Sequence, residues 1–475
     1  MPDFQPGTAT GPAKLKAVTL LVNKLTEDLD QVSLLPKDRD EALEELKIYG
    51  RDPRNADPIF TKEADFYKGI SMLLRHGFHS PSSDTSRAAL RVLANSMLLR
   101  PETRRMLVDQ GFAVKACEGL KTDNWDSEFL VSRILLLSTY GTKEHLTNLI
   151  VEHHLAENVT ENLGRHAKLA ATKPRQQPPM EDMALAEILK LLFNVTHFCK
   201  EEASRFSAAV PHIAELLWKQ DIPASNPLGP PFGPLVNALI NLDISTAANQ
   251  AAMFPSSEPS KVAARLISLL DSAMATYNDN DLEATVTPLV STMLKVHEHA
   301  PSPVRQFISG KLLPTAEDRQ SVLGKGKTLS ARLLKNSTNP MAPALRDVIS
   351  HLFFEISGKD ASKFVENVGY GLASGFLFKN NVQIPANASA SFHASDSTGA
   401  QRLVNPITGQ FSDREKVSEM PPMTEDEKLR EAERLFVLFE RLKKNGVIDV
   451  ENPVVQAMRE GKFRDLGDDE VEELD

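Results

Sequence analysis

The residues best suited to chemistry in this chain are hydrogen-bond donors spaced four apart on an apolar stretch. Arg87, Arg91 and Asn95 lie beside or within "AALRVLANSMLL", residues 88–99. Because residues four apart share one face of a helix, they predict a narrow strip of donors on a helix that is otherwise buried. Guanidinium and amide N–H groups bind carbonyl and carboxylate oxygens, so this strip favours binding of a polypeptide segment.

Other patterns resemble catalytic or metal sites but are incomplete. "SVLGKGKT" at 321–328 has Ser321 where a phosphate-binding loop needs its first glycine, and no strand pattern precedes it. The "HEH" run at 297–299 lacks the spacing of a zinc-binding helix, and Cys117 and Cys199 are too far apart in the chain to suggest a structural metal site. We therefore expect no catalytic residues, no metal, no cofactor and no enzyme activity.

Composition favours an all-α protein. The chain has 475 residues, 41% of them hydrophobic and 6% aromatic, and is too long for one small core. Apolar residues recur every three or four positions in segments from 12–34 to 360–370, among them 101–120 and 142–164. The net charge of −10 argues against nucleic acid as a partner. We expect no membrane-spanning segment and, with two cysteines and no apolar leader, a reducing compartment.

A short motif recurs along the chain at intervals typical of helical repeats. Its copies are "LKIYGR", "LRVLAN", "SRILLL", "LKLLFN", "VNALIN" and "VSTMLK", which end at residues 51, 95, 137, 194, 241 and 295. Their separations of 44, 42, 57, 47 and 54 residues are those of armadillo and HEAT units lengthened by loops. We therefore predict an armadillo/HEAT-like α-solenoid superhelix over residues 1–383.

In an α-solenoid, one helix of each repeat lines the concave face and is packed on both sides by its neighbours. A polar strip at the same spacing recurs in Glu187, Lys190 and Asn194, and again in Asn237 and Asn241. A helix C-terminus is a suitable ligand, because its unpaired carbonyls and negative dipole end attract donors. The alternative, that a given residue caps or bridges neighbouring helices, stays open. The predicted partner-binding residues of the concave groove are Lys47, Arg51, Arg87, Arg91, Asn95, Lys190, Asn194, Asn237, Asn241 and Lys295.

The composition changes after about residue 383. Residues 384–423 are rich in Ser, Ala, Asn and Pro without a helical period, and predict a flexible linker. Residues 424–462 predict a C-terminal helical arm that starts with a capping box, and 463–475 form an acidic tail. The apolar face of the arm must be buried on the solenoid or on a partner. Its predicted partner-binding residues are Leu435, Phe436, Phe439 and Leu442.

Five segments, taken in order, resemble a known family. They are "AALRVLANSMLLRPETRRMLVDQG", "LAEILKLLFNVT", "VGYGLASGFLF", "VNPITGQ" and "MTEDEKLREAERLFVLFERLKKNGVIDVENPV". The chain resembles the synembryn family (resistance to inhibitors of cholinesterase), its fungal branch in particular, from about residue 40 to 460.

The resemblance implies a guanine-nucleotide exchange factor and folding chaperone for heterotrimeric G-protein α subunits. Such a protein binds the GDP form free of βγ, stabilises the nucleotide-free state and releases it when GTP binds. The α subunit's C-terminal helix is then expected to face Lys47, Arg51 and Asn95 in the groove, and the arm to reach the switch region. A cytoplasmic monomer is expected, with transient visits to the cytosolic face of the plasma membrane.

The resemblance has one departure, and the residues leave one alternative function. Animal members carry an acidic, phosphorylated run before the "NP-T-G" motif, whereas "ANASASFHASDSTGAQRL" here holds a single acid, Asp396. That phosphorylation is therefore not carried over. The alternative function is a generic armadillo-type peptide-binding adaptor or import-like scaffold. Import-type ladders pair asparagine with groove tryptophans, and Trp125 and Trp218 fall outside the repeat motifs, which favours the exchange factor.

Overall fold

The computed structural model describes residues 7–60, 68–170, 178–383, 392–396 and 399–415, with scattered residues between 424 and 437. It divides into one compact unit over Met1–Arg414 and a second over Glu415–Asp475. Nearly all regular structure in the described residues is helical, which confirms the predicted all-α class.

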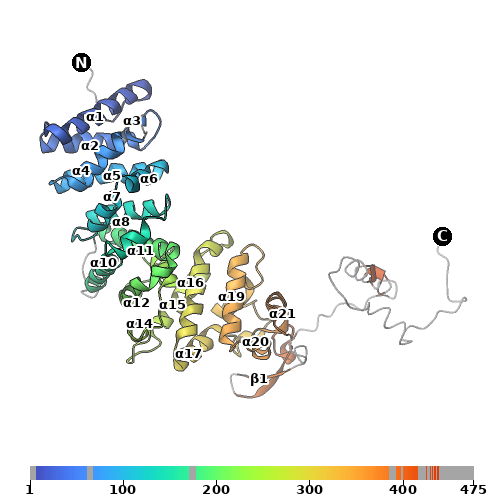
Figure 1. Cartoon of the computed structure of the whole chain (residues 1–475). Coiled ribbons are helices and arrows are strands. Elements are labelled where there is room, and N and C mark those ends of the chain that lie inside the picture. Colours follow the sequence, from blue (N-terminus) through green and yellow to red (C-terminus); the bar gives the residue numbers. More distant parts are fainter. Residues whose placement is uncertain are drawn as a thin grey trace, which may run out of the picture. The chain divides into compact units, whose positions relative to one another are not determined.

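Helices follow one another along the first unit, and a short hairpin comes after the last of them (Figure 1). The α-helices are α1 (Gly11–Gln31), α2 (Pro36–Gly50), α3 (Asp57–Phe60), α4 (Lys68–His79), α5 (Ser83–Leu99), α6 (Glu102–Asp109), α7 (Phe112–Glu118), α8 (Trp125–Thr139), α9 (Leu146–Val151), α10 (Leu155–Ala170), α11 (Pro179–Phe198), α12 (Val210–Lys219), α13 (Phe232–Asn241), α14 (Ala247–Met253), α15 (Lys261–Thr276), α16 (Asp279–His299), α17 (Ser302–Leu312), α18 (Leu329–Asn336), α19 (Pro343–Ile356), α20 (Ala361–Val368) and α21 (Tyr370–Lys379). The 3-10 helices are η1 (Lys200–Ala209), η2 (Asp318–Gln320) and η3 (Ser412–Arg414), and the strands are β1 (Phe392–Ser395) and β2 (Gln401–Val404).

A row of helices forms the spine of the first unit. In chain order, α2, α5, α8, α11, α13, α16 and α19 each contact the next, and we call them the inner helices. The remaining helices, such as α4, α10 and α15, pack against this row (Figure 1). The last residue of each predicted repeat motif lies in an inner helix or directly after it. The predicted helical repeat is therefore confirmed, and the motif copies fall on successive inner helices.

Apolar side chains on both flanks hold the inner helices together. In α5, Leu93 and Met97 are fully buried and Val92 is 1% exposed, so little of this helix is left for polar groups. One continuous core of such residues runs from Val18 to Leu377. Each fully buried side chain of this size contributes about 1.5–3 kcal/mol relative to an exposed one. The stack is therefore the main source of stability in the first unit.

Several predicted helices break at a residue with a positive φ. The predicted helix over 101–120 is two helices, α6 and α7, separated at Gly111 with a φ of 74°. The one over 142–164 is also two, α9 and α10, separated at His154 with a φ of 58°. A single left-handed residue ends a helix without disturbing the apolar period on either side. A prediction that uses only the apolar period therefore merges the two helices into one.

The prediction of a flexible linker over 384–423 was wrong for the part that the structure describes. Strand β1 pairs antiparallel with β2, and Val404 and Phe411 are fully buried. Arg319 lies in η2, between α17 and α18, and holds this segment in place. Its Nη1 donates to the Gly409 carbonyl at 2.9 Å, and its own carbonyl accepts from Phe411 N–H at 2.9 Å. The compact first unit therefore extends to Arg414.

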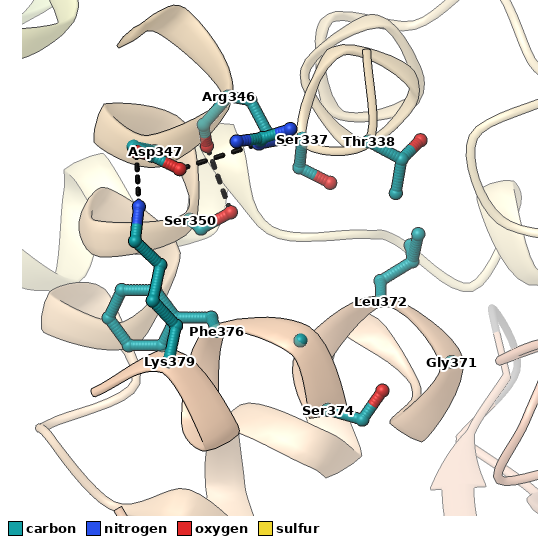
Figure 2. A pocket seen from close by; sticks show the side chains of 11 residues that line it. Ser337, Thr338, Arg346, Asp347, Ser350, Gly371, Leu372, Ser374, Phe376 and Lys379 are labelled. Atoms are coloured by element: carbon teal, nitrogen blue, oxygen red, sulfur yellow. Dashed lines mark hydrogen bonds and ion pairs between the residues drawn. The ribbon is translucent and has the colours of Figure 1, made fainter. Parts of the chain in front are cut away.

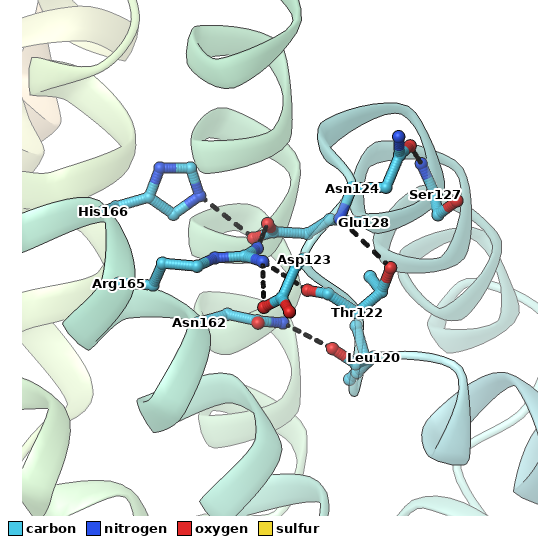
Figure 3. Close-up of polar contacts among 9 residues, drawn as sticks. All are labelled: Leu120, Thr122, Asp123, Asn124, Ser127, Glu128, Asn162, Arg165 and His166. Atoms are coloured by element: carbon cyan, nitrogen blue, oxygen red, sulfur yellow. Dashed lines mark hydrogen bonds and ion pairs between the residues drawn. The ribbon is translucent and has the colours of Figure 1, made fainter. Parts of the chain in front are cut away.

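Glu128 is a fully buried carboxylate of α8 with two basic partners on α10 (Figure 3). It accepts a hydrogen bond from Arg165, and its Oε1 lies 3.0 Å from Nε2 of His166. The Arg165 guanidinium also donates to the Thr122 carbonyl and lies 4.3 Å from the ring centroid of Trp125. The network joins the start of the inner helix α8 to α10 through side chains.

Replacing Glu128 with alanine should lower the free energy of unfolding by about 3 kcal/mol, because the buried His166 and the partly buried Arg165 would both lose their carboxylate partner. A matched control is Glu118→Ala, which removes an exposed ion pair with Lys115 and should cost at most about 1 kcal/mol. Urea unfolding followed by circular dichroism measures both. Equal losses for the two variants would contradict a stabilising role for the buried network.

Candidate protein-binding face

The predicted groove residues recur at equivalent positions of the repeat. Apart from Arg87, each is the last residue of a motif or the residue four before it, on α2, α5, α11, α13 and α16 or directly after α2. The set is called the ladder face and comprises Lys47, Arg51, Arg87, Arg91, Asn95, Lys190, Asn194, Asn237, Asn241 and Lys295.

Four ladder residues bridge neighbouring inner helices: Asn194, Asn241, Lys295 and, through its ion pair with Asp126 on α8, Arg91. Nδ2 of Asn194 donates to Thr139 Oγ1 at 2.8 Å, which links α11 to α8. Nδ2 of Asn241 lies 3.3 Å from Thr196 Oγ1 and 3.2 Å from the Phe193 carbonyl, which links α13 to α11. These side chains follow the bridging alternative, because their donors are already used within the solenoid.

Lys295 bridges in the same way, as a cap. Its Nζ donates to the carbonyls of Ile240, at 2.8 Å, and Leu242 at the end of α13. A cation at this position satisfies carbonyls that a helix end leaves unpaired and opposes the negative end of the helix dipole. Burial lowers the pKa of Lys295, and the nearby charge of Asp243 opposes that shift.

Asn95 occupies the same motif position but makes no side-chain bond to the described residues. The amides of Asn194 and Asn241 bond a threonine two residues after the end of the preceding motif copy, Thr139 and Thr196. For Asn95 the corresponding residue is Pro53, whose side chain has no hydrogen-bonding atom. At the sequence position that supplies the threonine in the later repeats, this repeat therefore has a residue that cannot bond the half-buried Asn95 amide.

Two further ladder residues keep donors available. Arg51 directly follows α2 and is exposed, with no side-chain partner among the described residues. Asn237 in α13 is half-buried, and its amide likewise bonds to nothing that the structure describes. Exposed apolar side chains accompany the first repeats: Ile48 is 39% exposed on α2, and Leu98 is 48% exposed one turn after Asn95. Donors and apolar surface together suit one face of an amphipathic helix.

The other ladder cations are paired with acids. Lys47 bonds Glu44 within α2, Arg87 bonds Asp84 at 2.5 Å, and Arg91 bonds Asp126 on α8 at 3.1 Å. Arg91 is 37% exposed, so its pair with Asp126 lies at the surface and can be exchanged for a ligand at small cost.

Sequence reasoning missed Arg133, which belongs to the same arrangement. Arg133 lies in α8 four residues before the end of "SRILLL", the position that Arg91 occupies in its own motif. Its Nη1 lies 3.2 Å from Glu187 Oε1 on α11, and Lys190 bonds the same oxygen at 2.8 Å. The motif spacing alone could have identified Arg133. Glu187, only 5% exposed, is shared by Arg133 and Lys190, so both cations of this part of the ladder face already hold an internal carboxylate partner.

Only a few residues of the second unit, between 424 and 437, are described. The carbonyl of Thr424 accepts from Lys428 N–H at 3.0 Å, as at the start of a helix, and Phe436 is helical and 36% exposed. Leu435, Phe439 and Leu442 of the predicted arm lie outside the described residues.

The chemistry available on the ladder face is binding through hydrogen bonds and apolar contact. In the described ranges, no group of three or more His, Cys, Asp or Glu side chains is arranged to hold a metal ion. None of the described helices combines the length and the apolarity that crossing a bilayer requires. Arg51, Asn95 and Asn237 are the donors that a partner can reach without displacing an internal bond.

Known proteins with similar sequences agree on one family. A family model described as guanine nucleotide exchange factor synembryn matches residues 42–462. A synembryn-like chaperone of Schizosaccharomyces pombe is 26% identical over 314 residues, which cover 61% of this chain and 57% of that protein. Chaperone Ric-8A of Macaca fascicularis is 25% identical over 466 residues, which cover 90% and 85%. A crystal structure of an engineered protein aligns with a TM-score of 0.41 at 17% identity over 59% of this chain and 97% of its own, too distant to inform the fold.

Asn194→Ala should destabilise the solenoid by about 1 kcal/mol, because it removes a buried bond between α11 and α8. Asn237→Ala is the matched control: its amide has no bond to lose, so its effect should stay within about 0.5 kcal/mol. Thermal unfolding of the two variants tests this. An equal shift of the melting temperature would show that the bridging bonds do not stabilise the stack.

Proposed function

We propose, on the premise that the chain belongs to the guanine nucleotide exchange factor synembryn family, that it acts as an exchange factor and chaperone for the α subunits of heterotrimeric G proteins. Its relatives in Schizosaccharomyces pombe and Macaca fascicularis are named chaperones. The substrate in this proposal is the GDP-bound α subunit free of βγ, which the chain holds without nucleotide and releases when GTP binds.

The proposed contact is between the ladder face and the C-terminal helix of the α subunit. The observation that carries it is the half-buried amide of Asn95, which has no partner among the described residues and lies one turn from the exposed Leu98, on a helix that packs against α2, which the exposed Arg51 follows. The last turn of a helix offers unpaired carbonyls and ends in a carboxylate, which suit an amide and a guanidinium. Apolar side chains of the same helix can cover Leu98 and Ile48.

Nucleotide exchange then follows from linkage, without a catalytic side chain. A partner that binds the nucleotide-free α subunit more tightly than the loaded one weakens nucleotide affinity by the same factor. The same preference stabilises a folded but empty α subunit by mass action, which is a chaperone effect. Exchange and chaperone activity are therefore two results of one binding preference.

The proposal assigns no bond-making chemistry to the chain itself. Residues 321–328, which resemble a phosphate-binding loop in sequence, lead into α18, where Thr328 Oγ1 accepts from Ala331 N–H at 3.1 Å. The same hydroxyl lies 2.5 Å from Asp318 Oδ1. A carboxylate at the base of this loop repels phosphate, which supports a protein without nucleotide affinity of its own.

Asn95→Ala should raise the Kd for a peptide of the α subunit's C-terminal helix about two- to tenfold, the loss expected for one hydrogen bond. Arg51→Ala should weaken binding too and reduce its dependence on salt, because screening acts on charged contacts. Fluorescence anisotropy at several salt concentrations measures both effects. The matched control is Asn148→Ala on α9, which removes an exposed amide that likewise has no bond to the described residues. If both ladder variants have a lower melting temperature but bind the peptide with an unchanged Kd, the proposed contact is wrong.

Deleting residues 424–475 should leave a folded solenoid but slow exchange, because the arm belongs to a separate compact unit. The readouts are helical content by circular dichroism and uptake of a fluorescent GTP analogue by an α subunit. Deleting only 463–475 is the control and should leave uptake unchanged, since that segment is an acidic tail. Full uptake without 424–475 would show that the arm takes no part in exchange.

A further inference from the structure

A cavity of about 360 Å³ lies at the far end of the first unit, away from the ladder face residues of α2 and α5. The end of α18, the first turns of α19 and one face of α21 enclose it (Figure 2). Its volume is at the lower end of the range for small-molecule sites. Any ligand it holds is therefore compact.

The positive charge of the cavity is concentrated on Arg346. Asp347, its only acidic residue, bonds Lys379 Nζ at 2.5 Å, so those two charges balance each other. Arg346 approaches Asp347 only through Nε, at 3.4 Å, and its two terminal nitrogens make no bond to the described residues. Arg346 and Ser337 both line the cavity, and both are labelled in Figure 2. A planar fork of free N–H donors is the group that binds a phosphate in a bidentate manner.

Hydroxyl groups line the rest of the cavity, and three of them, on Ser337, Thr338 and Ser350, already donate their protons to backbone carbonyls. Ser337 Oγ donates its proton to the Leu334 carbonyl at 2.7 Å, and Ser350 Oγ donates to the Arg346 carbonyl at 2.9 Å. Both serines are 8% exposed, so these bonds fix their oxygens in place. Each oxygen keeps lone pairs that accept from a ligand. Ser374, on the opposite wall, makes no side-chain bond to the described residues.

A rigid apolar wall completes the cavity. Phe376 contacts the rings of Phe354 and Phe364, with centroids 5.3 and 5.7 Å away, so its position is fixed by the core. Next to it, Gly375 leaves space: a Cβ built there meets no atom within 4 Å. The cavity therefore has stable walls and an open floor on α21.

We propose that this cavity binds a phosphorylated polyol, with the phosphate on the Arg346 guanidinium and ligand hydroxyls donating to Ser337 and Ser350. A bare phosphate would use the guanidinium but leave the serine acceptors unmatched. An uncharged polyol would match the serine acceptors but leave the Arg346 guanidinium without a phosphate. A sugar phosphate or an inositol monophosphate satisfies both sets of groups and matches the volume. The site is separate from the proposed contact with α subunits, and its test does not depend on that proposal.

Isothermal titration calorimetry of the full chain tests the proposal with four probes: myo-inositol 1-phosphate, glucose 6-phosphate, myo-inositol and inorganic phosphate. One or both phosphorylated polyols should bind at least about tenfold more tightly than myo-inositol and inorganic phosphate, since each of these lacks one set of contacts. Absence of binding by both phosphorylated polyols at millimolar concentration overturns the proposal. Equal affinity for inorganic phosphate overturns the assignment of a polyol.

Two variants place the binding in the cavity. Arg346→Gln should weaken binding of the phosphorylated polyol about tenfold or more, whereas Arg105→Gln, which removes an exposed surface arginine of α6, should not change it. Gly375→Leu should abolish binding by filling the open floor, and it should keep the helix, because leucine is a better helix former than glycine. Circular dichroism verifies the fold. Wild-type affinity in a folded Gly375→Leu variant overturns the site.

Discussion

The side-by-side packing of the inner helices constrains every polar group on the ladder face. Helix α5 lies between α2 and α8, and α11 lies between α8 and α13, so each has apolar neighbours on both flanks. A polar side chain in the remaining strip either bonds to the adjacent helix or keeps its donors for a partner. Asn194 and Asn241 bond to the adjacent helix, whereas the half-buried Asn95 has no side-chain bond to the described residues, although all three end a copy of the same motif. The residue two places after the preceding motif copy is threonine for Asn194 and Asn241 but proline for Asn95, and only threonine offers an oxygen.

This division explains how a solenoid can be both stable and open to a partner. The bridges at Asn194, Asn241 and Lys295 tie α8, α11, α13 and α16 together, while Arg51 and Asn95 in the first repeats keep donors that bond to none of the described residues. A face fixed by internal bonds loses little entropy when a partner binds, which favours affinity. The exposed donors and apolar residues near α2 and α5 therefore mark the place where the proposed helix end would bind.

Much of this arrangement could be predicted from the apolar period and the repeat spacing. Both locate the inner helices, because burial on two flanks leaves a distinct pattern in the sequence. Neither identifies breaks at single left-handed residues such as His154, nor the hairpin after α21, which depends on Arg319 reaching residues far along the chain. Whether a ladder asparagine is bridged depends on a residue in another repeat. Arg133 is different, since the spacing within "SRILLL" was sufficient to find it.

The central claim is that a helix end of the α subunit binds beside Asn95, and site-specific photo-crosslinking tests it most directly. A p-benzoylphenylalanine in place of Leu98, which is 48% exposed one turn from Asn95, reports what lies on this face. The same group in place of Asn148 on α9 is the reference. The account predicts that mass spectrometry finds crosslinks from position 98 to the last turn of the α subunit's C-terminal helix, and few from position 148. Equal crosslinking from both positions, or crosslinks from position 98 only to other parts of the α subunit, would contradict it.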